Sequence, residues 1–161
     1  MEKNNSNFEY MIIESSSEMF EELCKLCDNE VVIENHKKNG GTLNYTGIVS
    51  YSDYLIICVK DNNIIGFNSL MNRDIDGSIY VVQIAVKNAY KKMRIGTEII
   101  NQAKEIALQK QRKITADVRK YNKASQALFE SCGFIKNNNL YSSECYSYVY
   151  YQKKYGEKGL K

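Results

Sequence analysis

One stretch of the chain limits the fold more than any other, because it predicts a strand, a helix and a second strand in direct succession. Residues 78–87, SIYVVQIAVK, are apolar on both faces, as expected of a strand that helices cover on both sides of a sheet. Residues 95–110 carry an apolar stripe at helical spacing, and residues 113–119, KITADVR, form a second β-prone run. Strands joined by such a helix run parallel, so the sequence predicts an α/β domain with residues 78–87 near the centre of its sheet.

Shorter patterns extend this sheet on both sides. Residues 54–60 and 64–71 are β-branched, aromatic-rich runs around the polar turn DNN, which predicts a hairpin. Residues 122–132 predict a short helix that ends at Gly133, a residue suited to a left-handed helix stop. Two closing strands are predicted around FIKNN (134–138) and CYSYVYYQK (145–153).

The part of the chain before the hairpin is less regular. Ser15 lies three residues before Glu18, a capping-box spacing, and apolar residues follow at helical intervals, which predicts an amphipathic helix within residues 15–30. Residues 31–53 fit a second short helix up to Asn39 and otherwise receive no assignment.

Cysteine usage points to a reducing environment and to packing. The five cysteines are scattered and odd in number, which is a poor disulfide framework. Cys24 and Cys27 form a C-x-x-C pattern on the apolar face of the first predicted helix. His36 is the only histidine and no second C-x-x-C exists, so we interpret the pair as buried packing and expect no metal site.

Composition limits the classes of protein to consider. Hydrophobic residues make up 43% and charged residues 25%, as in a folded soluble protein. No linker or repeat divides the chain, so we expect one domain over residues 1–161, with residues 156–161 as a disordered tail. The net charge of +3 is too small to predict nucleic-acid binding. Without an apolar run long enough for a membrane helix, or a signal-peptide pattern, the expected location is the cytoplasm.

The loop after residues 78–87 is the first candidate site. It carries Lys91, Lys92 and Arg94 directly before a predicted helix, whose first turn has unpaired N–H groups and attracts phosphate. At about 6 Å and an effective dielectric of roughly 20, each cation–phosphate pair gains about 2 to 3 kcal/mol before screening. The loop matches neither a P-loop nor a dinucleotide-binding motif, and such lysines by themselves could be solvated loop charges.

A second motif supports the phosphate interpretation. Together, VVQIAVKNAYKKMRIGTEII (81–100) and VRKYNKASQALFESCGF (118–134) resemble the GCN5-related N-acetyltransferase (GNAT) family. The family carries [QR]-x-x-G-x-[GA] in its strand-loop-helix and N-x-x-[AS]-x-x-[LF]-Y-x-x-x-G-F later, and the resemblance covers about residues 54–154. It implies a GNAT-like fold, with a mixed central β-sheet, helices on both faces and a cofactor cleft between two parallel strands.

The resemblance also implies which residues bind acetyl-CoA as co-substrate. In the family, the strand backbone bonds the pantetheine arm and the acetyl carbonyl, the loop binds the pyrophosphate, and an asparagine of the last helix reaches the cofactor. In this chain Lys91 stands where glutamine or arginine is usual, and Arg94 replaces the first glycine of the motif. The implied cofactor-binding residues are Ile84, Ala85, Val86, Lys91, Lys92, Met93, Arg94, Ile95, Gly96, Thr97, Asn122, Ser125 and Phe129.

Catalytic residues are less clear from the resemblance. Phe129 replaces the tyrosine that usually protonates the departing thiolate, and Tyr80 stands where the histone-type branch has a carboxylate. Ser125 shares a predicted helix face with Asn122 and Phe129. Its hydroxyl either substitutes as the proton donor or only fills the small-residue position of the motif. Tyr146, Tyr148 and Tyr150 are further possible donors, and Cys132 is interpreted as buried.

These features predict an acetyl-CoA-dependent N-acetyltransferase that acts on a primary amine of a small molecule or protein by direct attack on the thioester. The alternative is a non-catalytic sensor or scaffold that binds CoA or acyl-CoA. Glu34 and Asp53 are candidate anchors for a cationic acceptor. The acceptor and the oligomeric state stay open, with a homodimer as one option.

Overall fold

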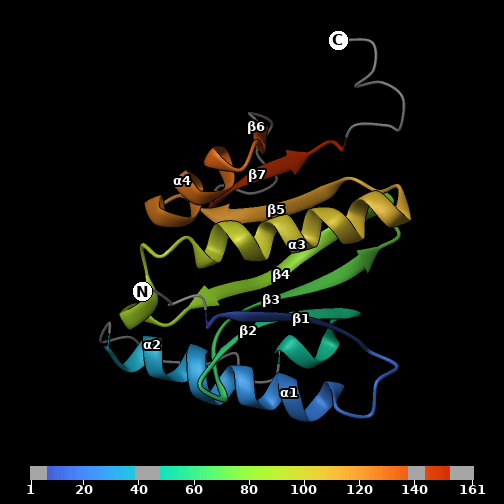
Figure 1. The fold of residues 1–161 in the computed structure, drawn as a ribbon. Coiled ribbons are helices and arrows are strands. Elements are labelled where there is room, and N and C mark those ends of the chain that lie inside the picture. The colour runs from blue at the N-terminus through green and yellow to red at the C-terminus, as the bar shows by residue number, and fades with distance from the viewer. Residues whose placement is uncertain (1–6, 39–47, 138–143, 153–161) are drawn as a thin grey trace.

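The protein folds as one mixed sheet with helices on both faces, as predicted. A computed structural model describes residues 7–38, 48–137 and 144–152, so the predicted tail at 156–161 lies outside the described residues. The seven-stranded sheet has the order β1-β2-β3-β4-β5-β7-β6, which puts β4 at its centre (Figure 1). The strands are β1 (Glu9–Glu14), β2 (Tyr54–Lys60), β3 (Asn63–Arg73), β4 (Ser78–Val86), β5 (Ile114–Arg119), β6 (Ile135–Asn137) and β7 (Cys145–Tyr150).

The helices lie where the sequence predicts them from the hairpin onward. The α-helices are α1 (Phe20–Cys27), α2 (Ile33–Lys38), α3 (Ile95–Lys110) and α4 (Lys123–Ser131). A π-helical segment, Asp28–Val32, joins α1 to α2, and 3₁₀ turns occupy Ile48–Tyr51 and Asn88–Tyr90. The predicted bounds of α3 are confirmed, and Gly133 has a φ of 90° directly after α4, in agreement with a left-handed stop.

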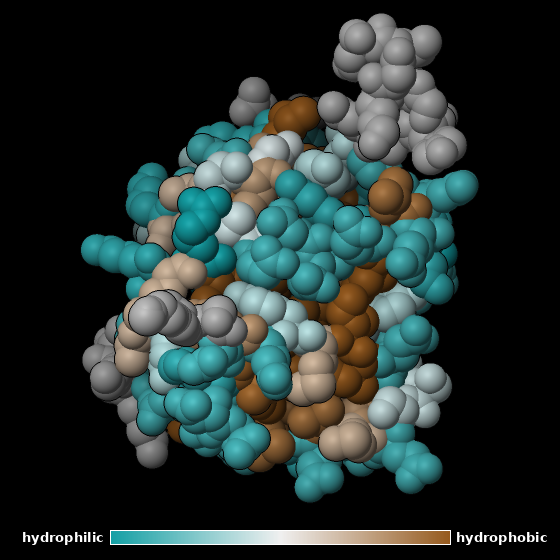
Figure 2. Space-filling model, in the orientation of Figure 1, coloured by the Kyte–Doolittle hydropathy of each residue, from teal (hydrophilic) through white to brown (hydrophobic). Residues whose placement is uncertain are grey.

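Two apolar clusters lie on opposite faces of the sheet. Along β2, Ile56 and Cys58 belong to the cluster under α3, whereas Leu55 and Ile57 belong to the cluster under α1. Successive strand residues point to opposite faces, so this alternation shows that helices cover both. Figure 1 shows α3 in front of the sheet, and in Figure 2 the outer surface of α3 is hydrophilic beside an apolar band.

The parallel pair β4–β5 separates soon after it forms. Its register contains only Ile79 with Ile114 and Tyr80 with Thr115. On the other side of β4, the register with β3 shifts by one residue between the pairs of Ser69 and Leu70. Such a bulge bends a strand and increases its twist. The halves of β4 and β5 that follow are therefore free to line a cleft.

In the early part of the chain, one strand was missed and one prediction is wrong. The missed strand, β1, pairs antiparallel with β2 along its whole length. The predicted capping box is absent, because α1 begins at Phe20 with Met19 as its N-cap and no side-chain cap. The Ser15 N–H instead donates to the carbonyl of Asp53 over 2.9 Å, since the chain first has to turn back from β1.

The cysteine pair packs as predicted. Cys24 and Cys27 are buried against the sheet, and burial raises the pKa of the Cys24 thiol to about 12. The same thiol donates to the carbonyl of Val49 over 3.4 Å. Cys132 is buried as well, so all three cysteines are parts of the core. No helix within the described residues is long and apolar enough to span a lipid bilayer.

Candidate functional site

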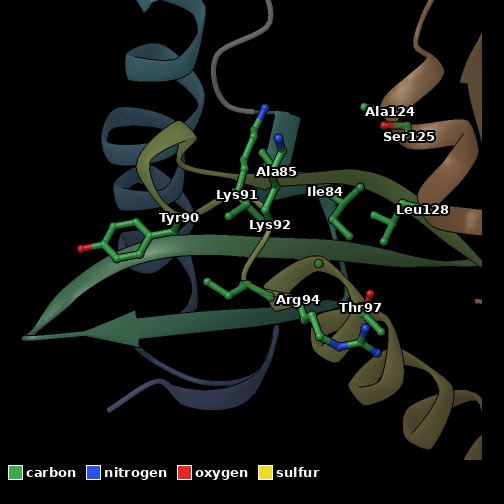
Figure 3. A pocket seen from close by; sticks show the side chains of 13 residues that line it. Ile84, Ala85, Tyr90, Lys91, Lys92, Arg94, Thr97, Ala124, Ser125 and Leu128 are labelled. Carbon is green, nitrogen blue, oxygen red and sulfur yellow. The ribbon is translucent and has the colours of Figure 1, made fainter. Parts of the chain in front are cut away.

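A cavity of about 490 Å³ opens where β4 ends and α3 begins (Figure 3). Its walls are the end of β4, the basic loop, the first turn of α3 and one side of α4. The structure brings together ten of the predicted cofactor residues here: Ile84, Ala85, Val86, Lys91, Lys92, Arg94, Ile95, Gly96, Thr97 and Ser125. Tyr90, Ala124 and Leu128 complete the lining and were not predicted, because their apolar groups match no position with a chemical role.

The loop reaches α3 through two left-handed residues. Lys92 has a φ of 71° and Arg94 a φ of 63°, although neither is glycine. This conformation costs a residue with a Cβ about 1 to 2 kcal/mol, which explains the glycine that the resembled motif has at the position of Arg94. Figure 3 shows the side chains of Lys91 and Lys92 on one side of the loop, whereas that of Arg94 runs toward Thr97.

The first turn of α3 presents unpaired amides to this cavity. Arg94 is the N-cap, and the first helical bond runs from the Glu98 N–H to the Arg94 carbonyl over 3.1 Å. The amides of residues 95–97 therefore have no partner inside the helix, and they add to the positive end of the helix dipole. With three basic side chains around them, these amides suit a phosphate group.

Gly96 has a packing role in this turn. A Cβ added at Gly96 would lie 3.2 Å from Cδ2 of Leu128 on α4, closer than ordinary contact. The missing side chain therefore lets α3 and α4 approach each other beside the cavity.

Asn35 of α2 holds the end of β4. Its Nδ2 donates to the carbonyl of Val86 over 2.7 Å, and its Oδ1 accepts from the Asn88 N–H over 3.3 Å. The sequence gives no signal for this contact, because Asn35 lies 51 residues before Val86 and no local pattern links the two. The contact fixes where the basic loop begins.

A second cavity, of about 350 Å³, lies where β4 and β5 separate. It is lined by residues 81–84 of β4, 116–119 of β5, and Asn122, Ser125 and Phe129 at α4. Ile84 and Ser125 line both cavities, so the cavities meet there. The shared helix face of Asn122, Ser125 and Phe129 is therefore confirmed, but Asn122 and Phe129 lie at the second cavity instead of the first.

The side chains where the two cavities meet differ in whether they are already hydrogen-bonded or buried. The Asn122 Oδ1 accepts from the Ser125 N–H over 3.1 Å and so caps α4. Phe129 is buried, with its ring centroid 5.0 Å from that of Phe134. The Ser125 hydroxyl has no hydrogen-bond partner within the described residues. Met93, also predicted to bind cofactor, lines neither cavity and is 53% exposed.

Sequence reasoning missed Asp117, the carboxylate that lines the second cavity. Its Oδ2 accepts a hydrogen bond from the Tyr80 hydroxyl over 3.1 Å. The Arg73 guanidinium lies 4.6 Å from the centre of the Tyr80 ring. Tyr80 itself lines neither cavity, so it contacts the second cavity only through Asp117. Only the parallel register of β4 with β5 brings the two together.

The tyrosines of β7 do not reach either cavity. The Tyr148 hydroxyl donates to Glu130 over 2.8 Å. Burial, together with this carboxylate, raises the pKa of Tyr148 to about 12. Tyr146 and Tyr150 line neither cavity, so the prediction of a proton donor on this strand is not supported.

The two predicted anchors for a cationic acceptor already have partners within the protein. Glu34 lies 3.5 Å from the ammonium group of Lys87. The Asp53 carboxylate accepts a hydrogen bond from the Asn72 N–H over 2.8 Å. Asp53 lines neither cavity.

Comparison with known proteins places this geometry in a family. A model of the acetyltransferase (GNAT) family matches residues 12–134. Among curated proteins, none matches the sequence.

Solved structures share the fold. Escherichia coli ElaA is 14% identical, with a TM-score of 0.68 over 90% of this chain and 99% of that chain. An acetyltransferase of Streptococcus agalactiae is 15% identical, with a TM-score of 0.70 over 92% and 100% of the two chains. A Bacillus anthracis protein, provisionally assigned as a streptothricin acetyltransferase and solved with acetyl coenzyme A, is 26% identical, with a TM-score of 0.55 over 62% of each chain.

Proposed function

Because the chain belongs to the acetyltransferase (GNAT) family, we propose that it is an N-acetyltransferase that uses acetyl-CoA to acetylate a primary amine of a small molecule or protein. The observation that carries the proposal is the first cavity, in which the basic loop, the unpaired amides of α3 and the free edge of β4 face one space. Acetyl-CoA combines a pyrophosphate with a long arm that can pair with a strand edge. The pyrophosphate suits the basic loop and the amides of α3, and the arm suits the free edge of β4.

The residues of the loop fit the phosphates of the ligand. Lys91, Lys92 and Arg94 supply three positive charges around the start of α3, where the amides of residues 95–97 can donate. Each cation–phosphate pair gains about 2 to 3 kcal/mol at about 6 Å before screening. The loop would therefore provide much of the binding energy and hold the donor in register with β4.

The end of β4 would orient the reacting group. Within the described residues, the side of β4 that faces β5 has no ladder partner beyond Tyr80. The backbone at Ile84, Ala85 and Val86 can thus bond the pantetheine arm, and a strand amide can stabilise negative charge that develops on the acetyl oxygen.

Acetyl-CoA supplies an activated thioester, and the CoA thiolate leaves when the amine attacks. Ser125 is the proposed proton donor to that thiolate, because Ser125 lies where the two cavities meet. Help from a general acid is typically worth about a hundredfold in rate or more. A thiol with a pKa near 8.5 already leaves fairly well, so the phenol that Phe129 lacks is not essential.

Two measurements test the proposal together. Acetyl-CoA should raise the melting temperature, and the protein should release CoA thiol from acetyl-CoA in the presence of an amine panel. Lys92→Ala should weaken acetyl-CoA binding, whereas Lys25→Ala, a control on α1, should not. Binding without thiol release across diverse amines and peptides would favour the sensor, and no binding at all would contradict both functions. The cytoplasm remains the predicted location.

A further inference from the structure

The second cavity has a polar wall that donor binding does not use. Asp117 on β5 is half-buried, and its Oδ2 is held by the Tyr80 hydroxyl over 3.1 Å. Within the described residues, the other oxygen, Oδ1, has no hydrogen-bond or ion-pair partner. The carboxylate is therefore fixed in place and still able to accept hydrogen bonds.

A second polar side chain, Gln83 on β4, lines the same cavity. Its Oε1 is buried and has no partner in the part of the chain that the structure describes. A buried carbonyl oxygen without a partner costs free energy, so a rotation that turns this amide toward a donating ligand would be favoured. The carboxylate of Asp117, and the Gln83 amide after such a rotation, offer oxygen atoms, and an ammonium group, with three donors and no acceptor, is complementary to them.

The basic groups near this wall do not cancel the carboxylate. Arg73 lies behind Tyr80, where its guanidinium contacts Asp76 at 2.9 Å. Arg119 also lines the cavity, but it is exposed, so solvent and salt screen its charge. Asp117 is half-buried, so its negative charge is screened less than that of Arg119.

Position connects this wall to the reaction. The second cavity meets the first at Ile84 and Ser125, where the thioester of a bound donor would lie. We propose that Asp117 binds the acceptor in the second cavity as an aliphatic ammonium ion, while Tyr80 holds the carboxylate in position. This inference rests on the proposed function. The bound ammonium loses a proton to solvent at the open mouth, and the neutral amine then attacks.

The test must vary the charge of the acceptor. Benzylamine is cationic at neutral pH, whereas aniline, of nearly the same shape, is neutral. Thiol release from acetyl-CoA is measured with benzylamine, butylamine and aniline for the wild type, Asp117→Asn and Asp74→Asn. Asp117→Asn keeps the shape and a partner for Tyr80, and Asp74→Asn removes the same charge from an exposed turn outside both cavities.

The expected result is selective. A hydrogen bond to a charged group is typically worth about tenfold to a hundredfold in binding, so Asp117→Asn should raise the KM for benzylamine by about that factor. The Kd for acetyl-CoA and the aniline kinetics should stay unchanged, as should all constants of Asp74→Asn. Equal kinetics for Asp117→Asn and Asp74→Asn, or a wild-type preference for aniline, would overturn the inference.

A failure of the proposed function would give a different result from a failure of the inference about Asp117. If the wild type releases no thiol with any amine or peptide, N-acetyl transfer is wrong. Calorimetric titration of benzylamine into the protein–CoA complex then decides the acceptor site separately. Benzylamine binding that is lost in Asp117→Asn and kept in Asp74→Asn would support the acceptor site. No binding of benzylamine to the wild type would overturn it.

Discussion

The Tyr80 hydroxyl donates to Asp117 Oδ2 over 3.1 Å, and this bond crosses from β4 to β5 at the place where their parallel register ends. It keeps a carboxylate at the mouth of the gap between the two strands. The bond therefore links the separation of the strands, which creates the cleft, to the chemistry of the second cavity.

Replacing Tyr80 by phenylalanine removes this bond but keeps the ring. Because Asp117 would then be held less firmly, the KM for the amine acceptor should rise by about three- to tenfold, with a smaller change in kcat. Steady-state kinetics and a titration with acetyl-CoA check the prediction. A parallel loss of acetyl-CoA affinity would show that Tyr80 supports the whole cleft and has no specific role in placing Asp117.

Arg94 combines a strained backbone with a useful charge. Arg94→Gly and Arg94→Ala both remove the cation, so acetyl-CoA affinity should fall by about three- to tenfold in each. Only glycine accepts the φ of 63° without a Cβ clash. Arg94→Gly should therefore be about 1 kcal/mol more stable than Arg94→Ala in urea unfolding. Equal stabilities would contradict the strain.

Gly96 can be tested by a double-mutant cycle with Leu128. In Gly96→Ala the gain in helix propensity and the 3.2 Å contact with Leu128 oppose each other, so stability should change by less than about 0.5 kcal/mol. In a Leu128→Ala background the contact is gone, and Gly96→Ala should stabilise by about 0.5 to 1 kcal/mol.

The same variants separate packing from phosphate contact at Gly96. If packing is its main role, the double variant should bind acetyl-CoA as tightly as Leu128→Ala does. Weaker binding of the double variant would show that the added methyl group blocks the approach of a phosphate.

Ser125→Ala tests the proposed proton donor. Loss of this general acid should lower kcat by about tenfold to a hundredfold, less than is typical because a thiol with a pKa near 8.5 already leaves fairly well, with little change in the amine KM. Adding Phe129→Tyr should recover part of the loss, because it restores a phenol at the position where the family usually has one. Unchanged turnover in Ser125→Ala would mean that Ser125 only fills the small-residue position of the motif.

Asp76 should make stability depend on pH. Its hydrogen bond with Arg73 holds the pKa of Asp76 well below its usual range. A lowered folded-state pKa stabilises the protein above the unfolded-state value of about 3.9, and the stabilisation is lost as the pH falls through the folded-state pKa. Asp76→Asn should therefore be less stable at pH 7, by under about 1 kcal/mol because the pair is partly exposed.

The comparison that tests this is urea unfolding of the wild type and Asp76→Asn at pH 7 and in acid. The difference between them should shrink as the pH falls below about 4. Asp74→Asn serves as the control for removal of an exposed charge. A difference that stays constant with pH would exclude the ion pair as its cause.

The sequence by itself determined the donor side of the protein. Residues 84–97 are contiguous, so a strand, a basic loop and a helix start suffice to place them around one cavity. The hairpin and α3 were also predictable, because their apolar periodicity and turn residues are local signals. Asp61 and Asn62 both adopt positive φ in the predicted turn, as short hairpin turns require.

Only the tertiary structure decided the proposed acceptor side and the first strand. β1 is an edge strand whose residues are mostly exposed, so its stability comes from pairing with β2 and not from a pattern of its own. Asp117 meets Tyr80 across 37 residues of sequence, and Asn35 meets Val86 across 51. Such contacts depend on strand register and helix placement, which the packing of the whole domain fixes, so no short stretch of sequence contains them.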